Sequence, residues 1–150
     1  EASAELLLIL GAPFRQGLGG PGGWRLLAEP ELHLGEDVLV PDLAGWREAR
    51  FPRRSGAFYS VAPDWLCEVL SPSTALLDRN RKLPLYAGAG VEYAWLVDPA
   101  AQALEAFQRE GEGWRLLESF SGEAKVRADP FAALEFDLGL LWPDAHTPAR

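Results

Sequence analysis

Short runs of β-favouring residues, separated by glycine, proline and other turn residues, constrain the fold of this chain most strongly. Only two stretches, 3–10 and 71–90, have the character of helices. The strand-like runs cover residues 24–34, 37–46, 61–70, 91–99, 103–110 and 113–120. This order of a helix, a hairpin, a strand, a helix and further strands predicts a mixed β-sheet with few helices, in a domain of the α/β or α+β class.

Three local features refine this expectation. Gly35 separates the first two runs, which predicts a hairpin. Pro84 would either kink a helix that begins near Thr74 or lie in the first turn of a helix that begins near Lys82, and glycine should end this helix near residue 90. The apolar tail 129–142 is expected to dock on the core.

The length and composition suit a single globular domain. The chain has 150 residues, of which 48% are hydrophobic, enough for one core over residues 1–150. No segment has the ~18 apolar residues of a membrane span, and acidic rather than basic residues precede the apolar run 6–10. We therefore expect a cytoplasmic protein without a membrane partner. The chain begins at Glu1 and contains no methionine, which predicts that part of an N-terminal segment is missing.

The loop 16–23 contains the G-x-G-x-x-G pattern of dinucleotide-binding loops, at Gly17, Gly19 and Gly22. A dinucleotide-binding loop must open a helix, because the helix N-terminus binds the pyrophosphate. This loop leads instead into a strand-like run, so dinucleotide binding is not favoured.

Two carboxylates stand within the strand-like runs. Glu68 lies in the apolar run 65–70, and Asp42 follows Pro41, which should make its strand bulge or fray. Each acid alone would more often cap a turn or pair with an arginine. Two acids on adjacent strands repel each other unless a cation lies between them. They predict a Mg²⁺ site, in which Mn²⁺ can substitute, and a raised pKa for Glu68 without metal.

Lys82 follows these acids along the chain, in the second helical stretch. Asp78 lies four residues before it, so the two share a helix face, and for Asp78 we expect a surface ion pair. Beside a metal, Lys82 would hold the attacking water and offset charge that develops on a phosphate. Asp42, Glu68 and Lys82 are thus predicted to catalyse phosphodiester hydrolysis, with Asp42 and Glu68 as the metal ligands.

The net charge of −8 argues against a surface that binds nucleic acid throughout, because lysine and arginine supply the affinity for phosphates. One local cluster of basic residues is present, with Glu48 as the single acid among them: Arg47, Arg50, Arg53 and Arg54. The cluster predicts either contact with DNA phosphates or a solvated loop.

The stretches "VPDLAGW" (40–46) and "PDWLCEVLSPSTALLDRNRKLPLYAGAGVEYAWLVDP" (63–99) resemble the Uma2 family, a restriction-endonuclease-like branch of the PD-(D/E)XK nuclease superfamily. The resemblance covers most of the chain. It implies a restriction-endonuclease-like core, in which a mixed sheet is flanked by helices. It also implies that Asp42 matches the Pro-Asp acid of the family and that Glu68 matches its second acid.

Two departures from the superfamily pattern concern the site. The superfamily lysine lies two residues beyond the second acid, where this chain has Leu70, and the resemblance implies that Lys82 takes its place from the following helix. Relatives also carry an acid in a segment before the first helix. Glu31 would either approach the metal in its place or lie at an exposed edge.

These observations favour a Mg²⁺-dependent endonuclease that hydrolyses phosphodiester bonds of DNA. A non-catalytic binding or assembly module built on the same fold is the alternative, and the acidic balance favours it. A homodimer would help to cut two strands, and Trp46 and Trp142, expected to be exposed, could form its contact.

Overall fold

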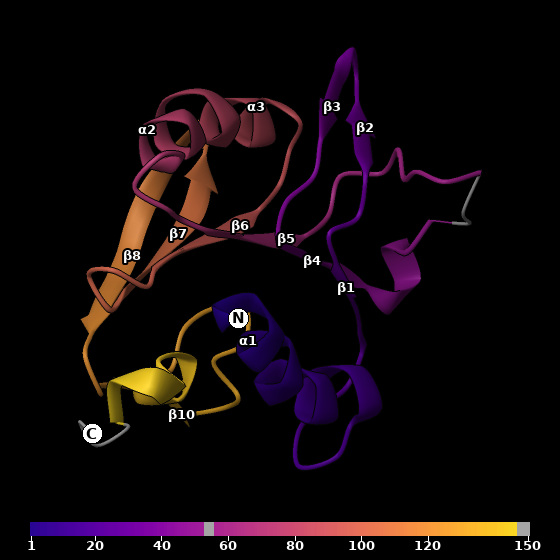
Figure 1. Cartoon of the computed structure of the whole chain (residues 1–150). Helices are drawn as coiled ribbons and strands as arrows, with labels where there is room; N and C mark the ends of the chain where they lie inside the picture. The colour runs from indigo at the N-terminus through magenta and orange to yellow at the C-terminus, as the bar shows by residue number, and fades with distance from the viewer. Residues whose placement is uncertain (53–55, 147–150) are drawn as a thin grey trace.

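A six-stranded mixed β-sheet forms the centre of the protein (Figure 1). The computed structural model describes residues 1–52 and 56–146. Strands β5 and β6 are parallel, and all other neighbours in the sheet are antiparallel, which confirms the predicted class. In spatial order the strands are β1 (Trp24–Ala28), β4 (Leu43–Arg47), β5 (Trp65–Val69), β6 (Tyr93–Asp98), β7 (Ala103–Glu110) and β8 (Gly113–Ser121).

Helical segments cover both faces of the sheet (Figure 1). One face packs against α1 (Ala2–Leu10) and its π-helical continuation η1 (Gly11–Gln16), and the other against the series α2 (Ala75–Leu77), η3 (Asp78–Lys82) and α3 (Leu83–Gly88). Side chains alternate along β5, so that Cys67 joins the core on the α1 side and Leu66 the core on the α3 side. Glu68 therefore points toward the α3 layer. None of the described helices combines the length and the apolar character that crossing a membrane requires.

The predicted helix over 71–90 is present, with one wide turn in its middle. Helical structure begins at Ala75, passes through the π-helical turn η3, and continues in α3, whose first turn contains Pro84. Both expectations for Pro84 are thus partly met. A proline has no N–H to donate to the preceding turn, and a π-turn is one way to accommodate the missing hydrogen bond. Gly90, with a φ of 91°, ends the segment as predicted.

The predicted hairpin of the runs 24–34 and 37–46 is divided into two parts. β1 pairs with β4, whereas β2 (Leu32–Leu34) and β3 (Asp37–Leu39) form a separate two-stranded sheet that turns at Gly35, whose φ is 65°. Pro30 and Pro41 lie at the breaks, where a residue without an N–H cannot extend the ladder. Asp42 consequently occupies a bend immediately before β4.

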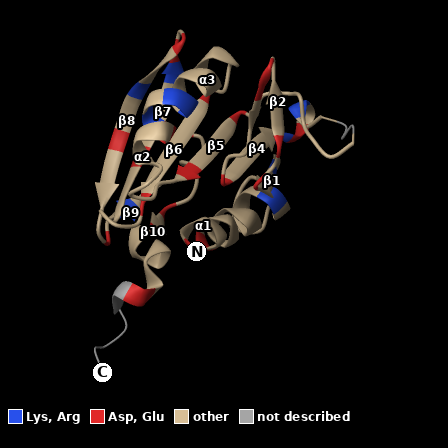
Figure 2. Cartoon of the chain, turned by 45° about the horizontal axis from the view of Figure 1, so that its top comes forward, with Lys and Arg blue, Asp and Glu red and all other residues tan. Residues whose placement is uncertain are grey.

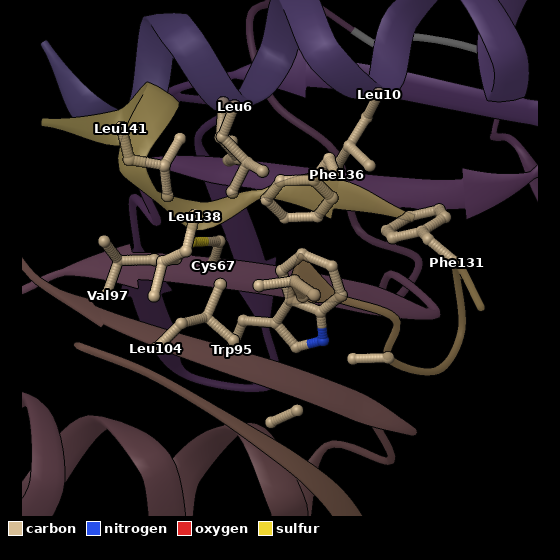
Figure 3. Packing of buried hydrophobic residues seen from close by; sticks show 14 of the residues in the cluster. Leu6, Leu10, Cys67, Trp95, Val97, Leu104, Phe131, Phe136, Leu138 and Leu141 are labelled. Atoms are coloured by element: carbon tan, nitrogen blue, oxygen red, sulfur yellow. The ribbon is translucent and has the colours of Figure 1, made fainter. Parts of the chain in front are cut away.

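The C-terminal tail docks on the core as predicted. Phe131, Phe136 and Leu138 pack with Leu6 of α1 and Trp95 of β6 in one buried apolar cluster (Figure 3). The remaining short elements are η2 (Glu48–Arg50), β9 (Lys125–Val126), β10 (Phe136–Asp137), η4 (Leu138–Leu141) and η5 (Pro143–His146).

Trp46 and Trp142 are buried, so the prediction that they form an exposed dimer contact is wrong. Their exposed fractions are 0% and 6%. Each indole N–H donates to a carbonyl oxygen at 2.9 Å, of Val61 for Trp46 and of Gly122 for Trp142. A satisfied N–H lets a large apolar ring enter the core. The homodimer itself stays a prediction, which a mass measurement in solution would check.

The glycine-rich loop leads into β1 and not into a helix, as the sequence indicated. Gly20 packs so closely against Pro13 that a Cβ atom there would lie 2.5 Å from Pro13 Cβ. The need for a small residue at this point of the loop is therefore structural.

Candidate active site

Two hydrogen bonds hold Asp42 against the end of β5, one from Val69 and one to Glu68. The Val69 N–H donates to Asp42 Oδ2 at 2.7 Å, and the Asp42 N–H donates to Glu68 Oε1 at 3.1 Å. The antiparallel register sets Leu43 opposite Cys67, and this places the residue before Leu43 beside the residue after Cys67. The structure thus brings the two acids together on neighbouring strands.

Glu68 is almost fully buried, with an exposed fraction of 1%. Its further partners come from the helical layer: Lys82 Nζ lies 3.2 Å from Oε2, and the Tyr86 hydroxyl donates to the same oxygen at 3.4 Å. Burial, together with the negative charges of Asp78 and Asp42, raises the pKa of Glu68 to about 7, against the opposing effect of Lys82. The direction of this shift is the one that the sequence predicted.

Asp42 is half-buried, so its carboxylate is less desolvated than that of Glu68. Burial raises the pKa of Asp42, and the hydrogen bond from the Val69 N–H partly offsets this effect. Burial thus makes the charged form of each carboxylate less favourable than it would be in water. The negative charges of neighbouring acids add to this effect, because Asp78 raises the pKa of both Asp42 and Glu68.

Figure 2 shows the helical layer of α2 and α3 that faces the sheet. Lys82 reaches the site from η3, which joins these two helices. Its Nζ atom lies 3.2 Å from Glu68 Oε2 and 3.2 Å from Asp78 Oδ1. Burial disfavours the ammonium, but the Glu68 and Asp78 carboxylates outweigh this effect and raise the pKa of Lys82, so it is charged at neutral pH. Leu70, which directly follows β5 and packs in the same cluster as Leu66, is instead a core residue.

Asp78 belongs to the site. The predicted ion pair with Lys82 is present, but it is buried and does not lie at the surface. The side chain pairs with Lys82, but only 4% of it is exposed. Its buried Oδ1 atom accepts no hydrogen bond of good geometry from the described residues, although Lys82 Nζ is close. The burial of Asp78 could have been predicted from the sequence. Asp78 and Lys82 share a helix face, so a lysine that points at Glu68 carries Asp78 inward with it.

Tyr86 is a second site residue that the sequence analysis missed. It is fully buried, and burial, with the nearby Glu68 carboxylate, raises the pKa of its hydroxyl well above the ordinary value, so the hydroxyl stays a donor. The spacing 78, 82, 86 is the signal, because residues four apart on a helix follow one stripe.

The described arginines of the predicted cluster lie away from the carboxylates. Arg47 ends β4, five residues from Asp42 and therefore about 17 Å along the strand. Its guanidinium stacks on Trp24, 4.7 Å from the ring centroid, and Arg50 pairs with Asp64 at 2.6 Å. The other two members of the cluster, Arg53 and Arg54, lie outside the described residues. A role of this cluster in DNA binding stays a prediction.

The Glu31 side chain is exposed, in line with one of the two expectations for it, although its backbone carbonyl accepts a hydrogen bond from the Tyr59 N–H and so does not form an open strand edge. Its carboxylate pairs with His33 Nε2 at 2.8 Å, and 47% of its side chain is exposed. Within residues 1–52 and 56–146, no group of three or more histidine, cysteine, aspartate or glutamate side chains is arranged to hold a metal ion. Any metal at this site would thus depend on few protein ligands and on water or substrate oxygens.

Comparison with known proteins identifies the family of this chain and a solved structure with a similar fold. The model of the Uma2 family, described as "Putative restriction endonuclease", matches residues 1–140. Among solved structures, "a putative nuclease belonging to DUF820" from Anabaena variabilis ATCC 29413 has a TM-score of 0.75 and 22% identity, over 95% of this chain and 78% of that chain. This likeness bears on the fold. No curated protein matches the chain. The family match confirms the resemblance read from residues 40–46 and 63–99, and the chain belongs to the Uma2 family.

Proposed function

We propose that this protein is a Mg²⁺-dependent endonuclease that hydrolyses phosphodiester bonds of DNA in the cytoplasm. One observation carries the proposal: buried Glu68 contacts Asp42 from the next strand and Lys82 from the helical layer. The family description supports nuclease chemistry. Because a buried carboxylate destabilises a fold unless its charge is used or compensated, an arrangement of this kind is typical of a functional site.

The donor atoms of the site fit a hard divalent cation. Asp42, Glu68 and Asp78 bring three carboxylates against the single ammonium of Lys82, which leaves two negative charges when all are ionised. The buried Asp78 Oδ1, with no well-directed hydrogen bond from the described residues, is a further sign of this excess. Asp42 and Glu68 would hold Mg²⁺ or Mn²⁺. When bound, the ion would lower the pKa of a water and polarise the phosphate.

Lys82 supplies the positive charge that acts on the reacting phosphate. Its ammonium is held from two sides by Glu68 and Asp78, so it is pre-oriented and need not reorganise during the reaction. Charge that develops on the phosphate oxygens is then offset by a fixed cation in a partly buried site. Asp78 is a positioning residue in this mechanism, since it acts through Lys82.

The alternative, a non-catalytic module on the same fold, is favoured by one observation, the net charge of −8. A plasmid-nicking assay in Mg²⁺, in Mn²⁺ and in EDTA separates the two functions. The endonuclease should nick DNA with either metal and not in EDTA. A wild-type protein that leaves the plasmid intact under all three conditions would make the non-catalytic module the better conclusion.

We further propose that the arginine cluster contacts DNA phosphates at a distance from the cut. A duplex that reaches from Asp42 to Arg47 would extend about 17 Å along β4. Replacing Arg50 and Arg53 by alanine should weaken binding equally for all sequences and reduce the slope of log K against log salt by about 0.9 per lost contact. Asp64→Asn is the control for Arg50, because it breaks the same ion pair and keeps the arginine. A salt slope equal to that of the wild type would make the cluster a solvated loop.

A further inference from the structure

Arg81 differs from most arginines of the described chain in having no acidic partner. The described residues provide it with neither an ion pair nor a hydrogen bond, and it is exposed. Neighbouring Arg79, by contrast, is neutralised by Glu105. The other ion-paired arginines are Arg25, Arg50, Arg109, Arg115 and Arg127. In an acidic protein, an arginine beside a candidate active site that the described residues leave unpaired is available to a ligand.

Arg81 lines a hollow of about 190 Å³ between β3 and the helical layer. Lys82 lines the same hollow and also contacts Glu68, so the hollow adjoins the candidate active site. Its walls include the apolar side chains of Val38 and Leu77, which are 58% and 45% exposed. The combination of a free guanidinium with exposed apolar walls suits a ligand that is part anion and part apolar.

We propose that this hollow binds one nucleotide of the DNA strand next to the scissile phosphate, with Arg81 on the phosphate and Val38 and Leu77 against the sugar and base. The inference rests on the proposed function. A guanidinium offers two parallel N–H donors to a phosphate, whereas the ammonium of Lys82 is already engaged by two carboxylates. Arg81 is therefore the described cation of η3 that can bind a second phosphate.

The geometry also predicts how Arg81 differs in effect from Lys82. A contact with a phosphate that does not react strengthens the ground state and the transition state equally, so its loss raises KM and leaves kcat unchanged. Asp37 lies on the wall of the hollow and carries the opposite charge. Its neutralisation should therefore strengthen binding.

The test compares Arg81→Ala, Arg81→Lys and Asp37→Asn with the wild type and with Arg15→Ala. Arg15 is a matched control, because it is exposed, has no ion pair among the described residues, and lies in η1 on the opposite face of the sheet. Binding of a fluorescein-labelled duplex is measured by anisotropy in EDTA between about 50 and 200 mM NaCl. Initial rates of cleavage with Mg²⁺ then give KM and kcat.

Arg81→Ala should weaken binding roughly tenfold and reduce the salt slope by about 0.9, with Arg81→Lys intermediate, Asp37→Asn tighter and Arg15→Ala unchanged. Equal affinities and slopes for Arg81→Ala and Arg15→Ala would overturn the inference, even if the wild type cuts DNA. Arg81-dependent binding without cleavage would support the inference while the proposed function fails. A wild type that neither binds the duplex in EDTA nor cuts it with Mg²⁺ would overturn both.

Discussion

Lys82→Ala is expected to slow DNA cleavage by about 10²–10³-fold while metal binding is retained. The reason is the position of Nζ, 3.2 Å from both Glu68 Oε2 and Asp78 Oδ1, where it acts as a pre-oriented cation for the reacting phosphate. The variant keeps Asp42 and Glu68, the proposed metal ligands. Added metal should therefore still stabilise it, by about 2.7 kcal/mol at a hundredfold excess over the dissociation constant.

Asp42→Asn should behave differently, because it removes a charged ligand, so that metal affinity and cleavage fall together. A thermal-shift titration with Mn²⁺ and a plasmid-nicking assay, on the wild type and both variants, measure the two effects separately. If Lys82→Ala cuts as fast as the wild type, the helical lysine has no catalytic role. If Asp42→Asn binds Mn²⁺ as tightly as the wild type, Asp42 is not a metal ligand.

Neutralising Glu68 should make the metal-free protein progressively more stable, relative to the wild type, as pH rises. Burial raises the pKa of Glu68 from an ordinary 4.5 to about 7 in the folded state. Between these values the unfolded chain has lost the proton and the folded chain retains it, so the free energy of unfolding of the wild type falls with rising pH. Glu68→Gln has no titrating group at this position, so its free energy of unfolding does not fall for this reason. The stability difference should therefore shift by about 3 kcal/mol in favour of Glu68→Gln between pH 4.5 and pH 8.

Urea unfolding in EDTA at several pH values measures this shift. A stability difference between the two proteins that is the same at every pH does not affect the result, because only its change with pH is compared. Two further variants should move the pH window in opposite directions. Lys82→Ala removes a cation that lowers the pKa of Glu68, and Asp78→Asn removes an anion that raises it. Parallel pH profiles for the wild type and Glu68→Gln would show that Glu68 titrates alike in the folded and unfolded states.

The strand runs and the mixed sheet could be predicted because they depend on local information. The meeting of Asp42 with Glu68 is a contact across the sheet, and it was predicted from two acids in strand-like runs together with the family resemblance. Alternation of apolar residues identifies a strand, and proline marks where a ladder must stop. Pro41 therefore indicated the irregular backbone that places Asp42 in a bend immediately before β4. The same reasoning did not place the break at Pro30, so two paired strands and a separate hairpin were read as one long hairpin.

The errors concern residues whose surroundings come from distant parts of the chain. Asp78 was expected at the surface, since an acid four residues before a lysine on a helix is usually solvated. Its burial depends on the packing of η3 over β5, which local sequence does not describe. Trp46 and Trp142 were likewise expected outside, and only the positions of Val61 and Gly122 provide the carbonyl groups that let their rings be buried.

The sequence by itself determined which residue types are available to the site: two acids in strand-like runs, and a lysine in the helix that follows. It also determined the family, through residues 40–46 and 63–99. Only the tertiary structure decided that Asp78 and Tyr86 complete the surroundings of Glu68 and that the described arginines of the cluster lie at the other end of β4. It also decided that Arg81 has no ion pair or hydrogen bond among the residues that the structure describes. The physical reason is that burial and charge balance depend on all neighbours in space, whereas periodicity reports only the neighbours along the chain.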